Sequence, residues 1–189
     1  MPMSSRLPLP DPEAMNPEQR AVHDSIVASR GNLDGPFLAW LHSPGLAEPA
    51  QRLGAFCRYG TTLSPSESEL LILVVAAHLR CEAEAQIHAP IAARAGVAQD
   101  AIDAVAAGRR PAFGAEQARA AMLHDLAVEL LRTQRIDAAR FEAARAALGE
   151  QALVEAVGLV GYYALVAMTL NAFEMRARPP EPGMTRTQD

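Results

Sequence analysis

The chain has 189 residues, half of them apolar and only 5% aromatic. This length suits one compact domain with a real core, and an apolar fraction rich in alanine, leucine and valine suits close-packed helices rather than a β-sandwich. The formal net charge of -5 and the pI near 5.5, without any basic stripe, argue against non-specific binding to nucleic acid.

The cysteine content and the chain start bear on cellular setting. Cys57 and Cys81 are too few for a disulfide scaffold, so a reducing, cytoplasmic setting is expected. The N-terminus lacks a basic segment followed by an apolar core, and no signal peptide is expected. The longest apolar runs, 70–77 and 157–170, are too short for a membrane span and predict buried helices.

The N-terminal half begins with an arm and continues with capped helices. Prolines concentrated in residues 1–12 predict an extended N-terminal arm. Asn16 and Ser64 each precede a proline, the order expected of an N-cap and a first helical residue. The expected helices are 17–29, 36–42, 45–59 and 65–79. Apolar spacing predicts that the third of them buries three large side chains: Leu46, Leu53 and Phe56.

The C-terminal half is equally helical. Helices are expected over 81–95, 99–107, 116–132, 138–148 and 151–175. The last is apolar on every side, so it needs burial all round and favours assembly into a homo-oligomer. Residues 177–189 are polar and rich in proline and are expected to form a flexible tail.

No segment alternates apolar and polar residues as a half-buried strand would. We therefore expect an all-α fold, with a single helical domain of about seven or eight helices over residues 13–176. The sequence gives no reason to divide this domain.

Four reactive side chains bracket the aliphatic run 70–77: Glu69, Cys81, Glu84 and His88. If residues 81–88 are helical, the last three lie within roughly 60° of one another, because each residue turns by about 100°. A thiol, a carboxylate and an imidazole on one face of a buried helix predict an acid–base site. Glu84 and His88 at i and i+4 are also a common surface pair, and Cys81 alone is most often a small buried hydrophobe.

A pattern of residues points to a known family. It comprises Leu63-Ser64-Pro65, Glu69, the run 70–77, Cys81-Glu82-Ala83-Glu84 and His88. This pattern resembles the carboxymuconolactone decarboxylase family, which includes the alkylhydroperoxidase AhpD-like proteins. Segments 36–44 and 161–173 are similar to the entry helix and the C-terminal helix of longer members. The resemblance implies an AhpD-like helical fold and a homo-oligomer, as a dimer, trimer or hexamer.

One position departs from the peroxidase-like members, which carry Cys-x-x-Cys followed by His and an upstream Glu. Cys81, His88 and Glu69 match three of these positions, and Glu84 replaces the second cysteine. A dithiol peroxidase needs that second thiol to convert a sulfenic acid into a disulfide. Cys57 could substitute only by lying within about 7 Å, Cα to Cα. Glu84 and His88 resemble instead the Glu-x-x-x-His pair of the decarboxylase branch.

The resemblance implies decarboxylation of a small lactone or related acid without a cofactor. The enzyme must then stabilise an enolate-like charge and deliver a proton. We expect His88 to donate the proton and Glu84 to orient the imidazole and raise its pKa. Glu69 would accept a hydrogen bond from the Cys81 thiol or extend the proton relay.

Three other side chains are candidate substrate-binding groups. Tyr162 or Tyr163 could hydrogen-bond the developing oxyanion, and His78, one turn before Cys81, could join the cluster. A divalent ion could also be held by four side chains together: His78, Cys81, Glu84 and His88. We nevertheless expect neither a metal nor an organic cofactor. Asn171, inside the last apolar helix, is expected to bond an internal polar group. The other histidines are expected at the surface or its boundary: His23, His42 and His124.

Two other functional classes remain open. An AhpD-like thiol peroxidase, an antioxidant with peroxiredoxin activity, would lose hydroperoxide consumption in Cys81→Ser. A catalytically silent protein that binds a small ligand would show no change of turnover in Glu84→Gln or His88→Ala. In each case the expected partners are a small molecule and copies of the chain, and neither nucleic acid nor a membrane.

Overall fold

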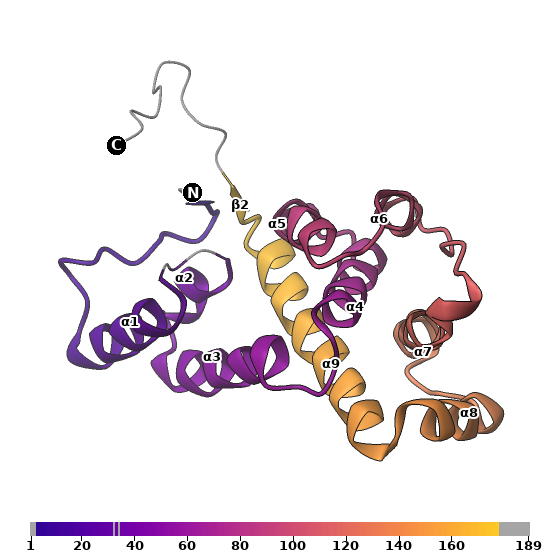
Figure 1. Ribbon diagram of the computed structural model, residues 1–189. Helices are drawn as coiled ribbons and strands as arrows, with labels where there is room; N and C mark the ends of the chain where they lie inside the picture. The colour runs from indigo at the N-terminus through magenta and orange to yellow at the C-terminus, as the bar shows by residue number, and fades with distance from the viewer. Residues whose placement is uncertain (1–2, 32, 34, 178–189) are drawn as a thin grey trace.

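The computed structural model describes residues 3–31, 33 and 35–177, so the expected tail lies outside the described residues apart from Ala177. Helices dominate the described part, and the expected all-α fold is confirmed (Figure 1). In chain order the elements are β1 (Met3–Ser4), α1 (Pro17–Arg30), α2 (Phe37–Trp40), α3 (Pro44–Tyr59), α4 (Pro65–His78), α5 (Glu82–Arg94), α6 (Gln99–Ala106), the 3₁₀ turn η1 (Ala115–Gln117), α7 (Ala118–Thr133), α8 (Ala138–Leu148), α9 (Glu150–Ala172) and β2 (Arg176–Ala177). The described residues thus contain nine α-helices, one for each helical segment expected along the chain, although the domain as a whole was expected to hold about seven or eight.

Helix starts follow the local sequence signals. The Asn16 side chain accepts a hydrogen bond from the backbone N–H of Gln19, and the Ser64 side chain accepts one from that of Glu67. Helices α1 and α4 therefore both begin with complete capping boxes. The expected break near Arg80 is also present. Arg80 has a positive φ of 52°, so α4 stops and the chain reverses into α5. This reversal makes α4 and α5 a helical hairpin, whose two arms pack closely together.

Helix α4 forms the centre of the core. All its residues from Glu67 to Ala76 are buried, because α4 contacts α5, α6, α7 and α9 on its different sides. Figure 1 shows α4 between α9 and the α6–α7 region, with α3 on the other side of α9. An aliphatic run without polar interruption is what a helix surrounded on all sides requires.

The predicted core face of α3 is wrong. Leu46, Leu53 and Phe56 are 44%, 47% and 47% exposed. The buried face is the adjacent stripe of mostly small residues: Ala47, Ala50, Gln51, Gly54 and Cys57. Small side chains let α3 approach α1 and α9 closely, and the large ones are left outside.

The N-terminal arm is attached to the end of α9. Met3 and Ser4 pair with Ala177 and Arg176 in a two-residue antiparallel ladder that the sequence pattern did not predict. The Arg6 N–H donates to the Phe173 carbonyl at 2.9 Å. These bonds hold the arm beside the C-terminal end of α9 of its own chain (Figure 1).

Helix α9 is long and only partly covered. Its 23 residues are long and apolar enough to cross a membrane by length and composition, in contrast to the sequence expectation from the shorter run 157–170. The rest of the chain buries 61% of its most apolar window, and the core helix of a soluble protein meets the same test. Burial all round is not achieved within one chain, because Val154 and Met168 are 70% and 59% exposed.

Candidate active site

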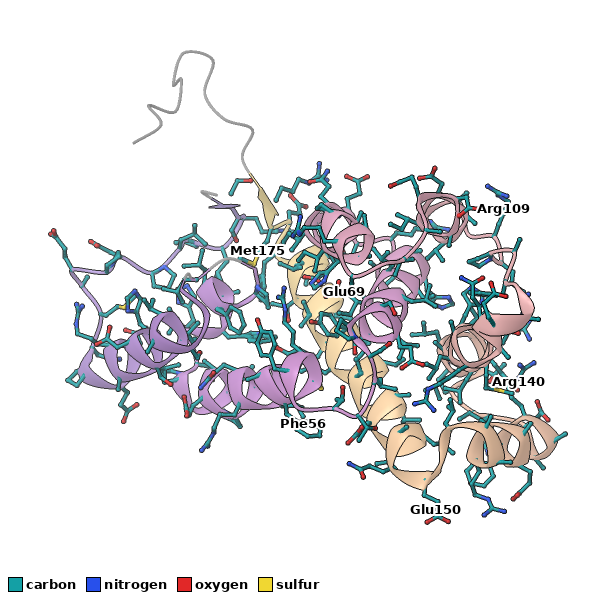
Figure 2. The ribbon with its side chains drawn as sticks, in the orientation of Figure 1. Phe56, Glu69, Arg109, Arg140, Glu150 and Met175 are labelled. Atoms are coloured by element: carbon teal, nitrogen blue, oxygen red, sulfur yellow. The ribbon has the colours of Figure 1, made fainter. Side chains whose placement is uncertain are left out.

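Three helices bring a buried polar cluster together. Glu69 comes from the first half of α4, Glu84 and His88 from α5, and Tyr163 from the middle of α9. Glu69, Glu84 and His88 are only 5%, 4% and 3% exposed. Figure 2 shows Glu69 in the middle of the molecule, where α9, α4 and α5 come close. The α4–α5 hairpin therefore joins residues that are 19 positions apart.

The imidazole of His88 lies between two carboxylates. Its Nδ1 is 2.7 Å from Glu69 Oε2, and its Nε2 is 3.3 Å from Glu84 Oε2. In the tautomer that carries the proton on Nδ1, the ring donates a hydrogen bond to Glu69 Oε2. This short contact is typical of a charge-assisted hydrogen bond. Nε2 is the ring nitrogen left for proton exchange with Glu84 or a ligand.

The carboxylate of Glu84 is incompletely bonded. Its Oε2 is buried and has no aligned hydrogen-bond partner, although Nε2 of His88 is 3.3 Å away. Burial raises the pKa of Glu84, against the opposing attraction of His88 and Arg58. A buried carboxyl with an unused acceptor and a raised pKa can hold or release a proton.

Aromatic rings form one wall of the cluster. The Tyr163 ring meets the His88 ring edge-on, with centroids 5.4 Å apart, and Tyr162 packs on Tyr163 at 5.3 Å. Trp40 packs on Tyr162 in turn, at 6.3 Å. Burial raises the pKa of Tyr163 far above its ordinary value, so its phenol is a neutral donor. Tyr163 is thus placed at the cluster, and Tyr162 lies one ring further away.

Cys81 is buried beside the cluster but is not on the expected helical face. It is the N-cap of α5, with an extended backbone, so it precedes the helical phase shared by Glu84 and His88. Its side chain lines a separate hollow of about 390 Å³ between α4, α5 and α6. Burial raises the pKa of the Cys81 thiol, and the pKa of Cys57 rises to about 11 for the same reason. Both cysteines are free.

His78 lies apart from the cluster, contrary to expectation. It is exposed and lines a cavity of about 700 Å³ on the α7 side of α4, because the reversal at Arg80 separates its direction from that of α5. The expected surface position of His124 is also wrong, since this residue is 5% exposed and its Nδ1 lies 2.9 Å from Asp125 Oδ1. Within the described ranges, no three His, Cys, Asp or Glu side chains form a metal-binding group.

Arg58 is a residue of this site that sequence reasoning missed. It is half-buried on α3, and its positive charge lowers the pKa of both Glu84 and Tyr163. Arg58 lies one turn after Gly54, on the buried side of α3. Correct assignment of the buried face of α3 would have directed attention to it.

Comparisons with known proteins agree with this geometry. Residues 44–124 match the carboxymuconolactone decarboxylase family, and this segment contains Glu69, Glu84 and His88. None of the curated proteins matches the chain in sequence. An uncharacterized peroxidase-related protein from Silicibacter sp. TM1040 has 16% identity and a TM-score of 0.74, with 90% of both chains covered. An uncharacterized peroxidase-related protein from Ralstonia eutropha JMP134, described as an alkylhydroperoxidase AhpD core, has 18% identity and a TM-score of 0.76, with 92% of both chains covered.

At these identities the two crystal structures establish the fold, and the family match covers α4 and α5, which carry Glu69, Glu84 and His88, but not α9. The expected fold is therefore confirmed, and so is the expected resemblance to the family over the matched residues. Residues 44–124 of this chain are thus similar to the carboxymuconolactone decarboxylase family, and its fold is that of an alkylhydroperoxidase AhpD core.

Proposed function

We propose that the chain is a cofactor-independent decarboxylase of a small lactone or a related acid. The observation that carries the proposal is the buried imidazole of His88 between two carboxylates, one of which has an unused oxygen. An arrangement of this kind is suited to proton transfer, and the family match gives a reaction class in which proton transfer is required.

The reaction needs a proton at the carbon that loses carbon dioxide. The bond between that carbon and the carboxylate breaks, and its electron pair passes into the neighbouring carbonyl as an enolate. His88 then protonates the carbon through Nε2, and Glu84 Oε2, 3.3 Å from Nε2, returns a proton to the ring. Glu69, bonded to Nδ1, stabilises the positively charged imidazole while the enolate exists.

Tyr163 supplies a donor for the enolate oxygen. Its phenol is neutral because burial raises its pKa, and its ring lies against the ring of His88. A neutral donor in a buried setting stabilises developing negative charge more effectively than one exposed to water. Tyr163→Phe therefore tests oxyanion stabilisation separately from proton delivery.

The test is release of carbon dioxide from a panel of γ-lactone acids and β-keto acids. We expect turnover by the native chain and a loss of about 10²–10⁴-fold in His88→Gln, the usual contribution of a positioned acid or base. Glu84→Gln should also lose activity. Glu82→Gln, which changes an exposed carboxylate on the same helix, is the matched control and should retain it. Full activity in His88→Gln would exclude the proposed proton donor.

The thiol-peroxidase alternative is tested on the same proteins. It requires a reactive Cys81 thiolate, whereas burial raises the pKa of that thiol, and Glu84 occupies the position of the partner cysteine. Hydroperoxide consumption that disappears in Cys81→Ser would support the peroxidase. A chain with neither activity, but with measurable affinity for the acids of the panel, would be a small-ligand binder.

A further inference from the structure

A cavity separate from the polar cluster lies on the α7 side of α4. It has a volume of about 700 Å³ and is lined by α4, α6, α7, the start of α8 and the loop after α6. Of the described residues that form the polar cluster, none lines this cavity: Glu69, Glu84, His88 and Tyr163. Pockets that hold small organic molecules have volumes of about 300–1,000 Å³, so the cavity is large enough for one.

Aliphatic side chains form the apolar part of the lining. Val74 and Ala77 come from α4, Val105 from α6 and Val128 from α7. Val74 and Val105 are both only 3% exposed, and the packing of α4 against α6 and α7 holds them in place. A surface of this kind favours the apolar body of a ligand over water.

Four arginines line the same cavity, in a chain whose net charge is -5. Arg109 and Arg110 follow Gly108, whose positive φ of 67° turns the chain at the end of α6. Arg132 lies in the last turn of α7, and Arg140 lies in the first turn of α8. Figure 2 shows Arg109 and Arg140 on the side of the molecule away from α3. Positive charge is thus gathered locally on an acidic protein.

Three carboxylates also line the cavity, but donors of the protein already bond them. Asp125 accepts two hydrogen bonds from Arg110, at 2.7 and 2.9 Å. Glu129 accepts one from the backbone N–H of Asp137 at 3.0 Å and forms an ion pair with Arg140. Asp137 caps α8 by accepting from backbone N–H groups of its first turn. These bonds neutralise two of the four arginines and fix the walls of the cavity.

The other two arginines have no acidic partner. Across residues 3–31, 33 and 35–177, the guanidinium groups of Arg109 and Arg132 form neither an ion pair nor a hydrogen bond. The buried imidazole of His124 also lines the cavity; its Nδ1 lies 2.9 Å from Asp125 Oδ1, which leaves Nε2 available to a ligand. A guanidinium stays charged at neutral pH, and its N–H groups match the geometry of a carboxylate or a phosphate. An anion would therefore complete the set of charges in this cavity.

We propose that this cavity binds a small organic anion, whose carboxylate or phosphate group pairs with Arg109 and Arg132 and whose apolar body covers the aliphatic lining. A neutral apolar molecule would leave both guanidinium groups unpaired. A cation would meet four arginines and only three carboxylates. A bare inorganic anion would leave the aliphatic surface uncovered. The site is distinct from the polar cluster, so the proposal holds whatever reaction that cluster catalyses.

The first test is recognition of charge, measured by isothermal titration calorimetry of the full chain at neutral pH and low ionic strength. The probes are hexanoate, hexyl phosphate, the neutral hexanamide and the cationic hexylamine. We expect both anions to bind, and hexanamide to bind on the order of 10–100-fold more weakly than hexanoate, because it loses charge-assisted hydrogen bonds. Tighter binding of hexyl phosphate than of hexanoate would support the site and identify a phosphate ester as the better ligand. Equal affinity for hexanamide, tighter binding of hexylamine, or no binding of either anion would overturn the proposal.

The second test locates the site by substitution. Arg109→Gln and Arg132→Gln should each weaken hexanoate binding by about 10-fold or more. Both residues are exposed and form no ion pair, so the fold should be retained. Arg94→Gln changes an exposed arginine of α5 outside the cavity and is the matched control, with native affinity expected.

Val128→Glu is a second probe of the same cavity. Val128 is 38% exposed, so a longer side chain fits at the surface, and the added carboxylate supplies the anion from the protein itself. Hexanoate binding should then be lost, while circular dichroism shows an unchanged helix content. Native hexanoate affinity in both arginine variants would overturn the proposal, because the anion would then bind elsewhere on the chain.

Discussion

Glu84 gives the sharpest prediction, because its burial should reduce the stability of the fold while its carboxyl group takes part in the proposed proton transfer. The side chain is 4% exposed, and its Oε2 has no aligned hydrogen-bond partner. Leaving a buried acceptor unsatisfied costs roughly 1–3 kcal/mol, and more when the group is charged. Glu84→Gln removes the charge at nearly constant volume, so we expect the variant to be more stable than the native chain near neutral pH while losing activity.

The effect should depend on pH in a defined direction. Burial raises the folded-state pKa of Glu84 above 4.5, so the folded state binds more protons than the unfolded state once the pH exceeds that value. The contribution of Glu84 to stability is therefore fully present below pH 4.5 and is lost as the pH rises through the folded-state pKa. A glutamine side chain does not titrate, so its contribution to stability does not change with pH. The gain in stability of Glu84→Gln over the native chain should therefore be absent at low pH and largest at the alkaline end.

Urea unfolding of the two proteins between about pH 4 and pH 8 measures this difference. A gain of roughly 1–3 kcal/mol at the upper limit is expected, with a negligible difference at the lower limit. For a chain of this size, each kcal/mol corresponds to about 2–4 °C in Tm. Glu82→Gln, an exposed change on the same helix, should show no comparable pH dependence. A variant destabilised equally at every pH would mean that the Glu84 carboxylate is well solvated or paired, and the reasoning would fail.

Three further outcomes follow, two from the same site and one from the buried thiol of Cys57. Glu69→Leu should lower stability by about 1.5–3 kcal/mol in urea unfolding, the opposite sign to Glu84→Gln, because it removes the 2.7 Å bond to His88 Nδ1; an unchanged midpoint would contradict this. Arg58→Gln should raise the pKa of Glu84, followed by carboxyl-carbon NMR, since the guanidinium now lowers it; an unchanged or lower pKa would show that this charge does not reach the site. Cys57, with a pKa of about 11, should react with an aromatic disulfide reagent on the order of 100-fold more slowly than in the urea-unfolded chain; equal rates would refute its burial.

The sequence predicted the helices well because their signals are local. Ser64 caps α4 through a bond three residues away, and the break at Arg80 follows from its position between an aliphatic run and the next amphipathic segment. The apolar run of α4 required burial on all sides, and four neighbouring helices provide it. Each of these features depends on residues within a few positions of one another.

The site was predicted less completely because it depends on relative helix placement. The i, i+4 spacing of Glu84 and His88 gave their shared face. The contact between Glu69 and His88 required the α4–α5 reversal, and the resemblance to a family indicated Glu69 without that geometry. The prediction that His78 joins the cluster assumes a helix that is continuous through Arg80. The chain reverses at Arg80, so His78 and Cys81 do not share a helical face.

The errors on α3 have a single cause. The apolar spacing predicts a buried stripe of large residues, but close helix packing favours small ones, and the observed buried face is shifted by one residue. The same shift hid Arg58, which shares the buried side with Gly54. It also places Leu53 and Phe56 in the interior, whereas both side chains are exposed.

The presence of Glu84, where the peroxidase-like pattern has its second cysteine, is central to the proposed chemistry of the site. A second thiol at this position could form a disulfide with Cys81, and the pair could then take part in redox chemistry. A carboxylate exchanges only protons, and it leaves the thiol of Cys81 without that partner at a pKa raised by burial. With Glu69 on one ring nitrogen and Glu84 beside the other, proton movement through His88 can begin and end on groups already in the core. We infer acid–base catalysis rather than redox chemistry from this arrangement. Loss of activity in His88→Gln, with retention in Cys81→Ser, is the outcome that the proposed function requires.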